Sequence, residues 1–134
     1  MSAVERLVGI PYVVDGRDWS GADCWGVIYL YFRAVHGIEV ERYDAAGAAT
    51  DQDRRALSAL IHREIAAPWH PVEEPRAGDV VLLRHGREIA HVGIWFDGGR
   101  VLHSPGPGPS VIERASSPHM RRRIVGFYRH EDLL

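Results

Sequence analysis

The only cysteine of the chain, Cys24, stands between Asp23 and Trp25 in the segment GRDWSGADCWG. A thiol becomes a strong nucleophile as the thiolate, which the unpaired amides and the positive dipole of a helix N-terminus stabilise. Because a helix is expected to begin at Cys24, the sequence predicts a thiol that reacts at neutral pH. Asp23 is expected to cap this helix, although its charge alone raises the thiol pKa. In the alternative interpretation, Cys24 is a small buried hydrophobic residue.

A thiol nucleophile needs a base that takes its proton and a third group that orients the base. His91 and His103 lie on two expected strands of the segment AHVGIWFDGGRVLHS, joined by a glycine-containing turn. A three-residue loop over 97–99 opposes Phe96 with Arg100 and brings both histidines to one face of the sheet. We therefore expect His91 and His103 to lie side by side. The remaining histidines are expected at the solvated surface: His36, His62, His70, His85, His119 and His130.

The elements that must position these residues change in character along the chain. Helical patterns cover 4–8, the stretch from Cys24 to a stop at Gly37, and 51–65. Short β-rich runs follow and predict an antiparallel meander, with strands at 80–83, 92–96, 101–103, 111–113 and 124–128. The proline-rich segment 104–110 is expected to be a surface loop. The pattern predicts one α+β domain over 1–134, with N-terminal helices packed on a C-terminal sheet.

Composition excludes several classes of protein. A formal net charge of −2 and a pI near 6.4 give no basic field, so nucleic acid and anionic membranes are not expected partners. One cysteine closes no internal disulfide and builds no multi-thiolate zinc site. The spacing of His91 and His103 matches no zinc pattern, even with Asp79 or Asp97 added, so neither metal nor cofactor is expected. Charged residues near the start argue against a signal peptide, and we expect synthesis in the cytoplasm without membrane insertion.

Three ordered motifs resemble the NlpC-type cell-wall cysteine peptidases, whose domain is a reduced papain-like α+β fold. GADCWG resembles the family's Asp-Cys-Ser-Gly box, RAGDVVLL its strand entry, and HVGIWFDGGRVLH its histidine hairpin. The resemblance implies that Cys24 is the nucleophile, His91 the base and His103 the orienting third residue. Tyr12, in GIPYVVDG, falls on the family tyrosine that helps to shape the site.

The resemblance also implies a substrate, the peptidoglycan stem peptide, cut by analogy between γ-D-glutamyl and diaminopimelate. Tyr12, Asp23 and Trp25 are the expected substrate-binding residues. Trp25 stands where peptidoglycan-specific members usually have a serine, and this feature resembles the phage-tail and prophage branch of the family. A virion location with tail-tip partners is then expected. In the alternative, the chain is a tail-assembly factor that docks through Trp19, Trp25 and the loop 104–110, with secondary or no hydrolytic activity.

Overall fold

The helix that carries the cysteine begins where the sequence predicts. The computed structural model describes residues 2–42 and 68–134, so the predicted helix over 51–65 and His62 lie outside the described residues. Helix α2 spans Cys24–Tyr31 and continues as the π-helical segment η1, Phe32–His36. The helix ends at Gly37, whose left-handed conformation (φ 67°) terminates the segment. Every residue of α2 is buried because the sequence is apolar around the whole helix.

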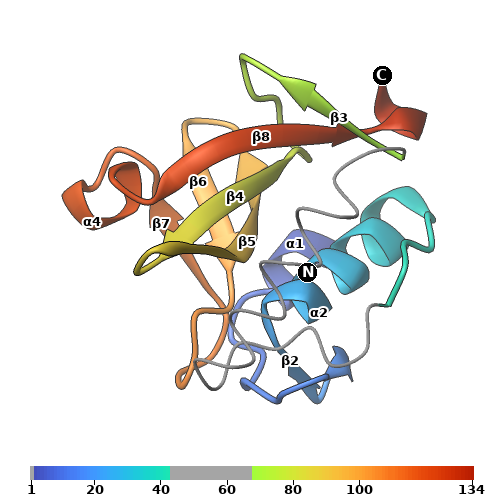
Figure 1. Cartoon of the computed structure of the whole chain (residues 1–134). Coiled ribbons are helices and arrows are strands. Elements are labelled where there is room, and N and C mark those ends of the chain that lie inside the picture. The colour runs from blue at the N-terminus through green and yellow to red at the C-terminus, as the bar shows by residue number, and fades with distance from the viewer. Residues whose placement is uncertain (1, 43–67) are drawn as a thin grey trace.

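A six-stranded antiparallel sheet forms the other layer, with strand order β3-β8-β4-β5-β6-β7 (Figure 1). Strands β4 to β7 are consecutive neighbours, so the predicted meander is confirmed for them, whereas β8 returns to lie between β3 and β4. The strands are β3 (Trp69–Val72), β4 (Val80–His85), β5 (Glu88–Phe96), β6 (Arg100–His103), β7 (Val111–Arg114) and β8 (Ile124–His130). This is the α+β class that the sequence predicts.

The two faces of the sheet bury different sets of side chains. Helix α2 packs against one face, and the sheet residues of that core include Val80, Leu82, Val92, Ile94 and Leu102. The opposite face carries a smaller core of Val81, Leu83, Val101, Ala115 and Met120. Met120 comes from the short helix α4, Pro118–Arg121, which precedes β8. Strands β4, β5 and β6 therefore have core residues or residues packed against a core on both faces.

Strand β3 is the main element that the sequence pattern did not predict. Pro68 and Pro71 flank or interrupt this stretch, and proline removes a backbone donor from a strand. The structure tolerates Pro71 because β3 is an edge strand that pairs only with β8. Near the N-terminus, helix α1 spans Ala3–Arg6, and the hairpin of β1 (Arg17–Asp18) and β2 (Gly21–Ala22) leads into α2. In the described part of the chain, the longest helix is too short to cross a membrane.

Candidate active site

The hairpin of β5 and β6 has the register that the sequence predicts. Phe96 lies opposite Arg100, and the connecting loop holds Gly98 and Gly99 at positive φ (79° and 70°). His103 is thus opposite Gly93, one pair away from His91, and both histidines project from the same face. His91 Nε2 and His103 Nδ1 are 2.7 Å apart and share a hydrogen bond. The prediction that the two histidines lie side by side is confirmed.

Gly93 makes room for this contact. A Cβ at that position would lie 2.7 Å from Val101 Cγ1 and 2.9 Å from the Leu102 carbonyl oxygen, closer than side chains pack. It would also lie 3.2 Å from the Cβ of His103. Since Gly93 is on the same face as both histidines, the absence of its side chain leaves space for the hydrogen-bonded pair.

Glu113 extends the histidine pair and was not among the residues predicted from the sequence. It lies on β7 opposite Val101, which brings it to the face of His103. Glu113 Oε2 is 2.5 Å from His103 Nε2, and Glu113 Oε1 is 2.9 Å from Nε2 of the exposed His119. Alternation along β7 is the signal that could have found Glu113, but it requires the β6–β7 register. Hydrogen bonds therefore connect His91, His103, Glu113 and His119 in series.

The carboxylate fixes which nitrogens of the histidines carry protons. Burial raises the pKa of Glu113, but the hydrogen bonds with His103 and His119 outweigh it, and the pKa lies below the ordinary value. An ionised carboxylate only accepts, so His103 donates from Nε2 and accepts at Nδ1. His91 must then donate from Nε2 to His103. The remaining nitrogen of His91, Nδ1, is left as the basic one.

The sulfur of Cys24 lies where β5 extends past the end of β6. The β5–β6 ladder ends at the Gly93–His103 pair, and the backbone amide of Val92, the residue after His91, donates a hydrogen bond to the sulfur. Cys24 is only 2% exposed. The structure thus brings the cysteine to the strand that carries His91.

The burial of Cys24 acts against the thiolate that the sequence predicts at neutral pH. Burial raises the pKa of the Cys24 thiol to about 12, and the charge of Asp23 adds to this shift. The amides of Val92 and Trp25 and the Arg17 guanidinium act in the opposite direction but do not compensate. The penalty for burying a charge exceeds the stabilisation from a helix terminus, which is why position at the helix start alone misleads.

The two histidines are also neutral. Burial holds the pKa of His91 well below its ordinary value, and the charges of His103, Arg123 and His85 act in the same direction. Burial lowers the pKa of His103 as well, although Glu113 partly opposes this. The thiol and both imidazoles are therefore neutral, and Nδ1 of His91 has the lone pair that can take a proton.

Asp23 caps helix α2, as the sequence predicts. Its Oδ1 accepts a hydrogen bond from the Gly26 amide at 2.8 Å and forms an ion pair with Arg17 at 2.7 Å. Its Oδ2 accepts a hydrogen bond from the Asp15 amide. The carboxylate is fully buried and all its oxygens are engaged. Asp23 thus has a structural role, in which it and Arg17 fix the start of the helix, and its contact with substrate stays a prediction.

Trp25 is buried, which corrects the prediction of an exposed aromatic surface. The side chain is 7% exposed, packs edge-on against Trp69 and donates from Nε1 to the Glu41 carbonyl at 2.6 Å. The unpredicted strand β3 supplies Trp69 and explains the burial. Tyr12 is half-buried with its ring beside Gly106, where an added Cβ would lie 3.0 Å from ring carbons. Its role in shaping the site stays a prediction.

The remaining histidines divide between core and surface. His85 and His119 are exposed as predicted, and His36 and His70 are partly buried. His130 is 6% exposed and packs against Phe32 and Trp69, so its predicted surface position is wrong. Within residues 2–42 and 68–134, no three His, Cys, Asp or Glu side chains are grouped as metal ligands.

Known proteins resemble this chain in sequence and structure. The profile of the NlpC/P60 family matches residues 9–129. The gamma-D-glutamyl-L-lysine dipeptidyl-peptidase of Bacillus subtilis is 31% identical over 108 residues, covering 78% of this chain and 31% of the Bacillus protein. The murein DD-endopeptidase MepS/murein LD-carboxypeptidase of Escherichia coli K12 is 24% identical over 115 residues, covering 86% of this chain and 53% of the E. coli protein. The chain thus spans about a third to a half of these relatives.

Solved structures agree in fold. The NlpC/p60 domain of the peptidoglycan hydrolase SagA superposes with a TM-score of 0.63 at 22% identity, covering 95% of this chain and 92% of that domain. An NlpC/P60 family protein from Bacillus cereus gives a TM-score of 0.65 at 21% identity, covering 97% of this chain and 40% of the Bacillus protein. At these identities the likeness concerns the fold alone.

Proposed function

Because the chain belongs to the NlpC/P60 family, we propose that it is a cysteine peptidase that hydrolyses peptidoglycan stem peptides. Peptidases of this family are cysteine peptidases or amidases that act on peptidoglycan. The observation that carries the proposal is the series of hydrogen bonds from His91 through His103 to Glu113. His91 is on β5, the strand whose Val92 amide donates to the Cys24 sulfur. This arrangement supplies a nucleophile, a base and an orienting group from three different elements.

In the proposed mechanism the thiol loses its proton as it attacks. Since burial holds the pKa of Cys24 at about 12, few thiolates exist in the free protein. His91 Nδ1 takes the proton while the sulfur forms a bond to the substrate carbonyl carbon. The imidazolium that results is stabilised through His103 by the carboxylate of Glu113. The ion pair therefore develops only when substrate is in place.

The remaining steps use the same groups in reverse. The backbone amide of Cys24, at the N-terminus of α2, donates to the oxyanion of the tetrahedral intermediate. His91 gives its proton to the leaving amine as the carbon–nitrogen bond breaks, which leaves an acyl-enzyme on the sulfur. His91 then takes a proton from water, the hydroxyl attacks the thioester carbonyl, and the thiol leaves with a proton. No cofactor takes part in these steps.

The finer proposal concerns the bond. The name of the Bacillus subtilis relative, a gamma-D-glutamyl-L-lysine dipeptidyl-peptidase, supports a γ-D-glutamyl bond as the target. We propose the bond between γ-D-glutamyl and a diamino acid, with diaminopimelate as the first candidate.

Digestion of purified sacculi tests the proposal directly. The protein is expected to release fragments whose masses locate the cut at the γ-D-glutamyl bond, and Cys24→Ala is expected to release none. The variant should keep its thermal midpoint within a few degrees because the substitution removes a single sulfur atom from the core. The proposal fails if Cys24→Ala releases the same fragments at the same rate, or if the folded parent protein releases none.

The expected phage-tail location and the tail-tip partners stay predictions. None of the relatives and structures described above is named as a virion component. The burial of Trp25 removes one of the surfaces on which the alternative docking role depended, whereas Trp19 is 36% exposed.

A further inference from the structure

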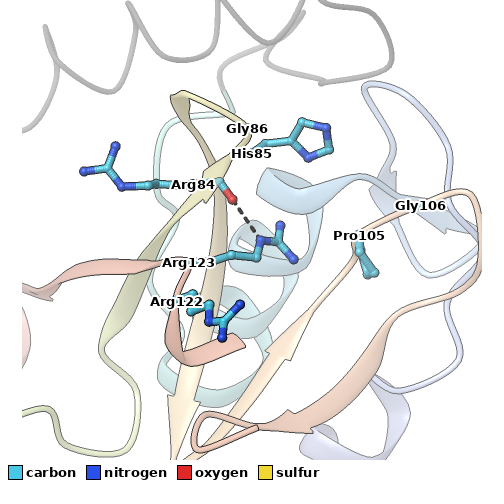
Figure 2. Close-up of a pocket in the computed structure, with 7 residues that line it drawn as sticks. All are labelled: Arg84, His85, Gly86, Pro105, Gly106, Arg122 and Arg123. Carbon is cyan, nitrogen blue, oxygen red and sulfur yellow. Dashed lines mark hydrogen bonds between the residues drawn. The ribbon is translucent and has the colours of Figure 1, made fainter. Parts of the chain in front are cut away.

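A basic cavity of about 460 Å³ lies at the ends of the strands β4 and β6. Figure 2 shows the residues that line it. Three segments line it: the end of β4 with the turn after it, the start of the loop after β6, and the residues that lead into β8. Its lining residues are Arg84, His85, Gly86, Pro105, Gly106, Arg122 and Arg123. All charged side chains among them are cationic, and no carboxylate lines the cavity.

The arginines of this cavity have no carboxylate partner in the described part of the chain. Arg123 Nε donates to the Arg84 carbonyl at 2.8 Å, which holds the side chain in place and leaves the terminal nitrogens for another acceptor. Figure 2 shows the Arg123 guanidinium pointing into the space between His85 and Pro105, whereas Arg84 extends away from them. Within residues 2–42 and 68–134, Arg84, Arg122 and Arg123 form no ion pair. Charges gathered without a counter-ion favour an anionic ligand.

The cavity adjoins the histidine pair. Arg84 follows Leu83, which lies opposite His91 in the sheet. Pro105 and Gly106 of the cavity follow His103 in the chain, and the charge of Arg123 lowers the pKa of both His91 and His103. On the other side, Gly106 lies against the ring of Tyr12. A ligand in the cavity would therefore extend toward the groups that carry the chemistry.

We propose that this cavity binds a free carboxylate of the peptide substrate through the guanidinium groups of Arg122 and Arg123. The inference rests on the proposed function and deepens it. A γ-linked glutamyl residue keeps its α-carboxylate free next to the bond that is cut, and diaminopimelate adds further carboxylate. The planar guanidinium matches a carboxylate with two parallel hydrogen bonds. A volume of about 460 Å³ accommodates a segment of one or two residues.

Binding to the Cys24→Ala protein separates this proposal from catalysis. The probe is the γ-D-glutamyl-diaminopimelate dipeptide, compared by calorimetry with one form amidated at the glutamyl α-carboxyl and another amidated at diaminopimelate. One of the two amides is expected to bind on the order of tenfold more weakly than the acid, since it loses a charged hydrogen bond. The affected amide identifies the carboxylate that the cavity holds.

Arginine variants test whether the weaker binding of the amide is due to this cavity. In Arg122→Gln and Arg123→Gln, the acid is expected to bind on the order of tenfold more weakly, and the difference between acid and amide should disappear. Arg121→Gln is the matched control, because Arg121 is exposed in the same arginine run but does not line the cavity. It should bind both forms as the parent does. Arg122→Gln keeps the test valid if Arg123→Gln unfolds through loss of its bond to Arg84.

The results that would overturn the carboxylate site differ from those that would overturn the peptidase function. The cavity assignment is overturned if Arg122→Gln and Arg123→Gln still prefer the acid as the parent does, or if inorganic phosphate displaces the dipeptide at equal concentration. If the sacculi are not cut but the arginine variants lose the preference for the acid, the carboxylate site stands and the peptidase function fails. If sacculi are cut equally by the parent and both variants, the function stands and the carboxylate site fails.

Discussion

Removing the carboxylate of Glu113 should slow catalysis without weakening substrate binding. His103 is fully buried and its Nε2 donates to Glu113, so Glu113→Ala leaves a buried donor without its charged acceptor. Such a loss is worth about 1.5–3 kcal/mol. If the transition state carries this loss, kcat should fall roughly 10- to 100-fold, because about 1.4 kcal/mol corresponds to a tenfold change in rate. KM should stay near the parent value, since Glu113 lies behind His103.

The loss falls on kcat because Glu113 fixes the tautomers of both histidines. Without the carboxylate, His103 is free to carry its proton on Nδ1 and donate to His91 Nε2. His91 would then carry its proton on Nδ1, where it cannot accept the proton of the thiol. Glu113→Gln keeps a neutral acceptor, and charge-assisted bonds are roughly twice as strong as neutral ones, so its loss should be about 3- to 10-fold.

Steady-state kinetics on a fluorogenic γ-D-glutamyl peptide give kcat and KM for the parent and both variants. Glu131→Gln, which changes an exposed carboxylate outside the site, is the control and should match the parent. The expected order of kcat is parent, Glu113→Gln, then Glu113→Ala. A Glu113→Ala protein within twofold of the parent kcat, or slower turnover in Glu113→Gln than in Glu113→Ala, would refute the reasoning.

Two further predictions concern stability. The fold lowers the pKa values of His91 and His103 below 6.5, whereas both side chains protonate near pH 6.5 in the unfolded chain. The free energy of unfolding should therefore be highest above pH 6.5 and decrease as the pH falls below it. Each histidine should lower the free energy of unfolding by up to about 1.4 kcal/mol per pH unit, as measured by urea unfolding at several pH values. A His91→Asn variant whose free energy of unfolding depends on pH as steeply as that of the parent would contradict this. Arg17→Met strands the buried Asp23 carboxylate and should lower the free energy of unfolding by about 3–5 kcal/mol. Arg33→Met, in an exposed pair at 4.0 Å, should change it by less than about 1 kcal/mol, and equal effects would argue against the buried pair.

Local rules predicted the parts of the site that are close in sequence. The parity of the β5–β6 hairpin follows from the paired glycines at 98 and 99, because a loop of fixed length sets the register of both strands. Helix α2 begins at Cys24 because Asp23 supplies its cap within the same short segment. In each case, the residues that decide the geometry lie within about a dozen positions of one another.

What the sequence did not reveal depends on contacts between distant segments. Glu113 meets His103 only through the β6–β7 register, which the seven-residue loop 104–110 does not determine. The burial of Trp25 depends on Trp69, which belongs to an edge strand that carries proline. The high pKa of Cys24 depends on the packing of α2 against β5, and that packing outweighs the local effect of the helix terminus. Propensity and spacing contain no information on such burial.

The burial of Cys24 has a consequence for the lifetime of the protein. Oxidation to sulfenic acid proceeds through the thiolate and follows its exposure to solvent. A sulfur that is 2% exposed, with a pKa of about 12, is protected on both counts while no substrate is bound. In the proposed mechanism the sulfur becomes a strong nucleophile only when its proton passes to His91 during the reaction. The same environment that withholds the thiolate from the resting protein is therefore expected to slow its oxidation by peroxide.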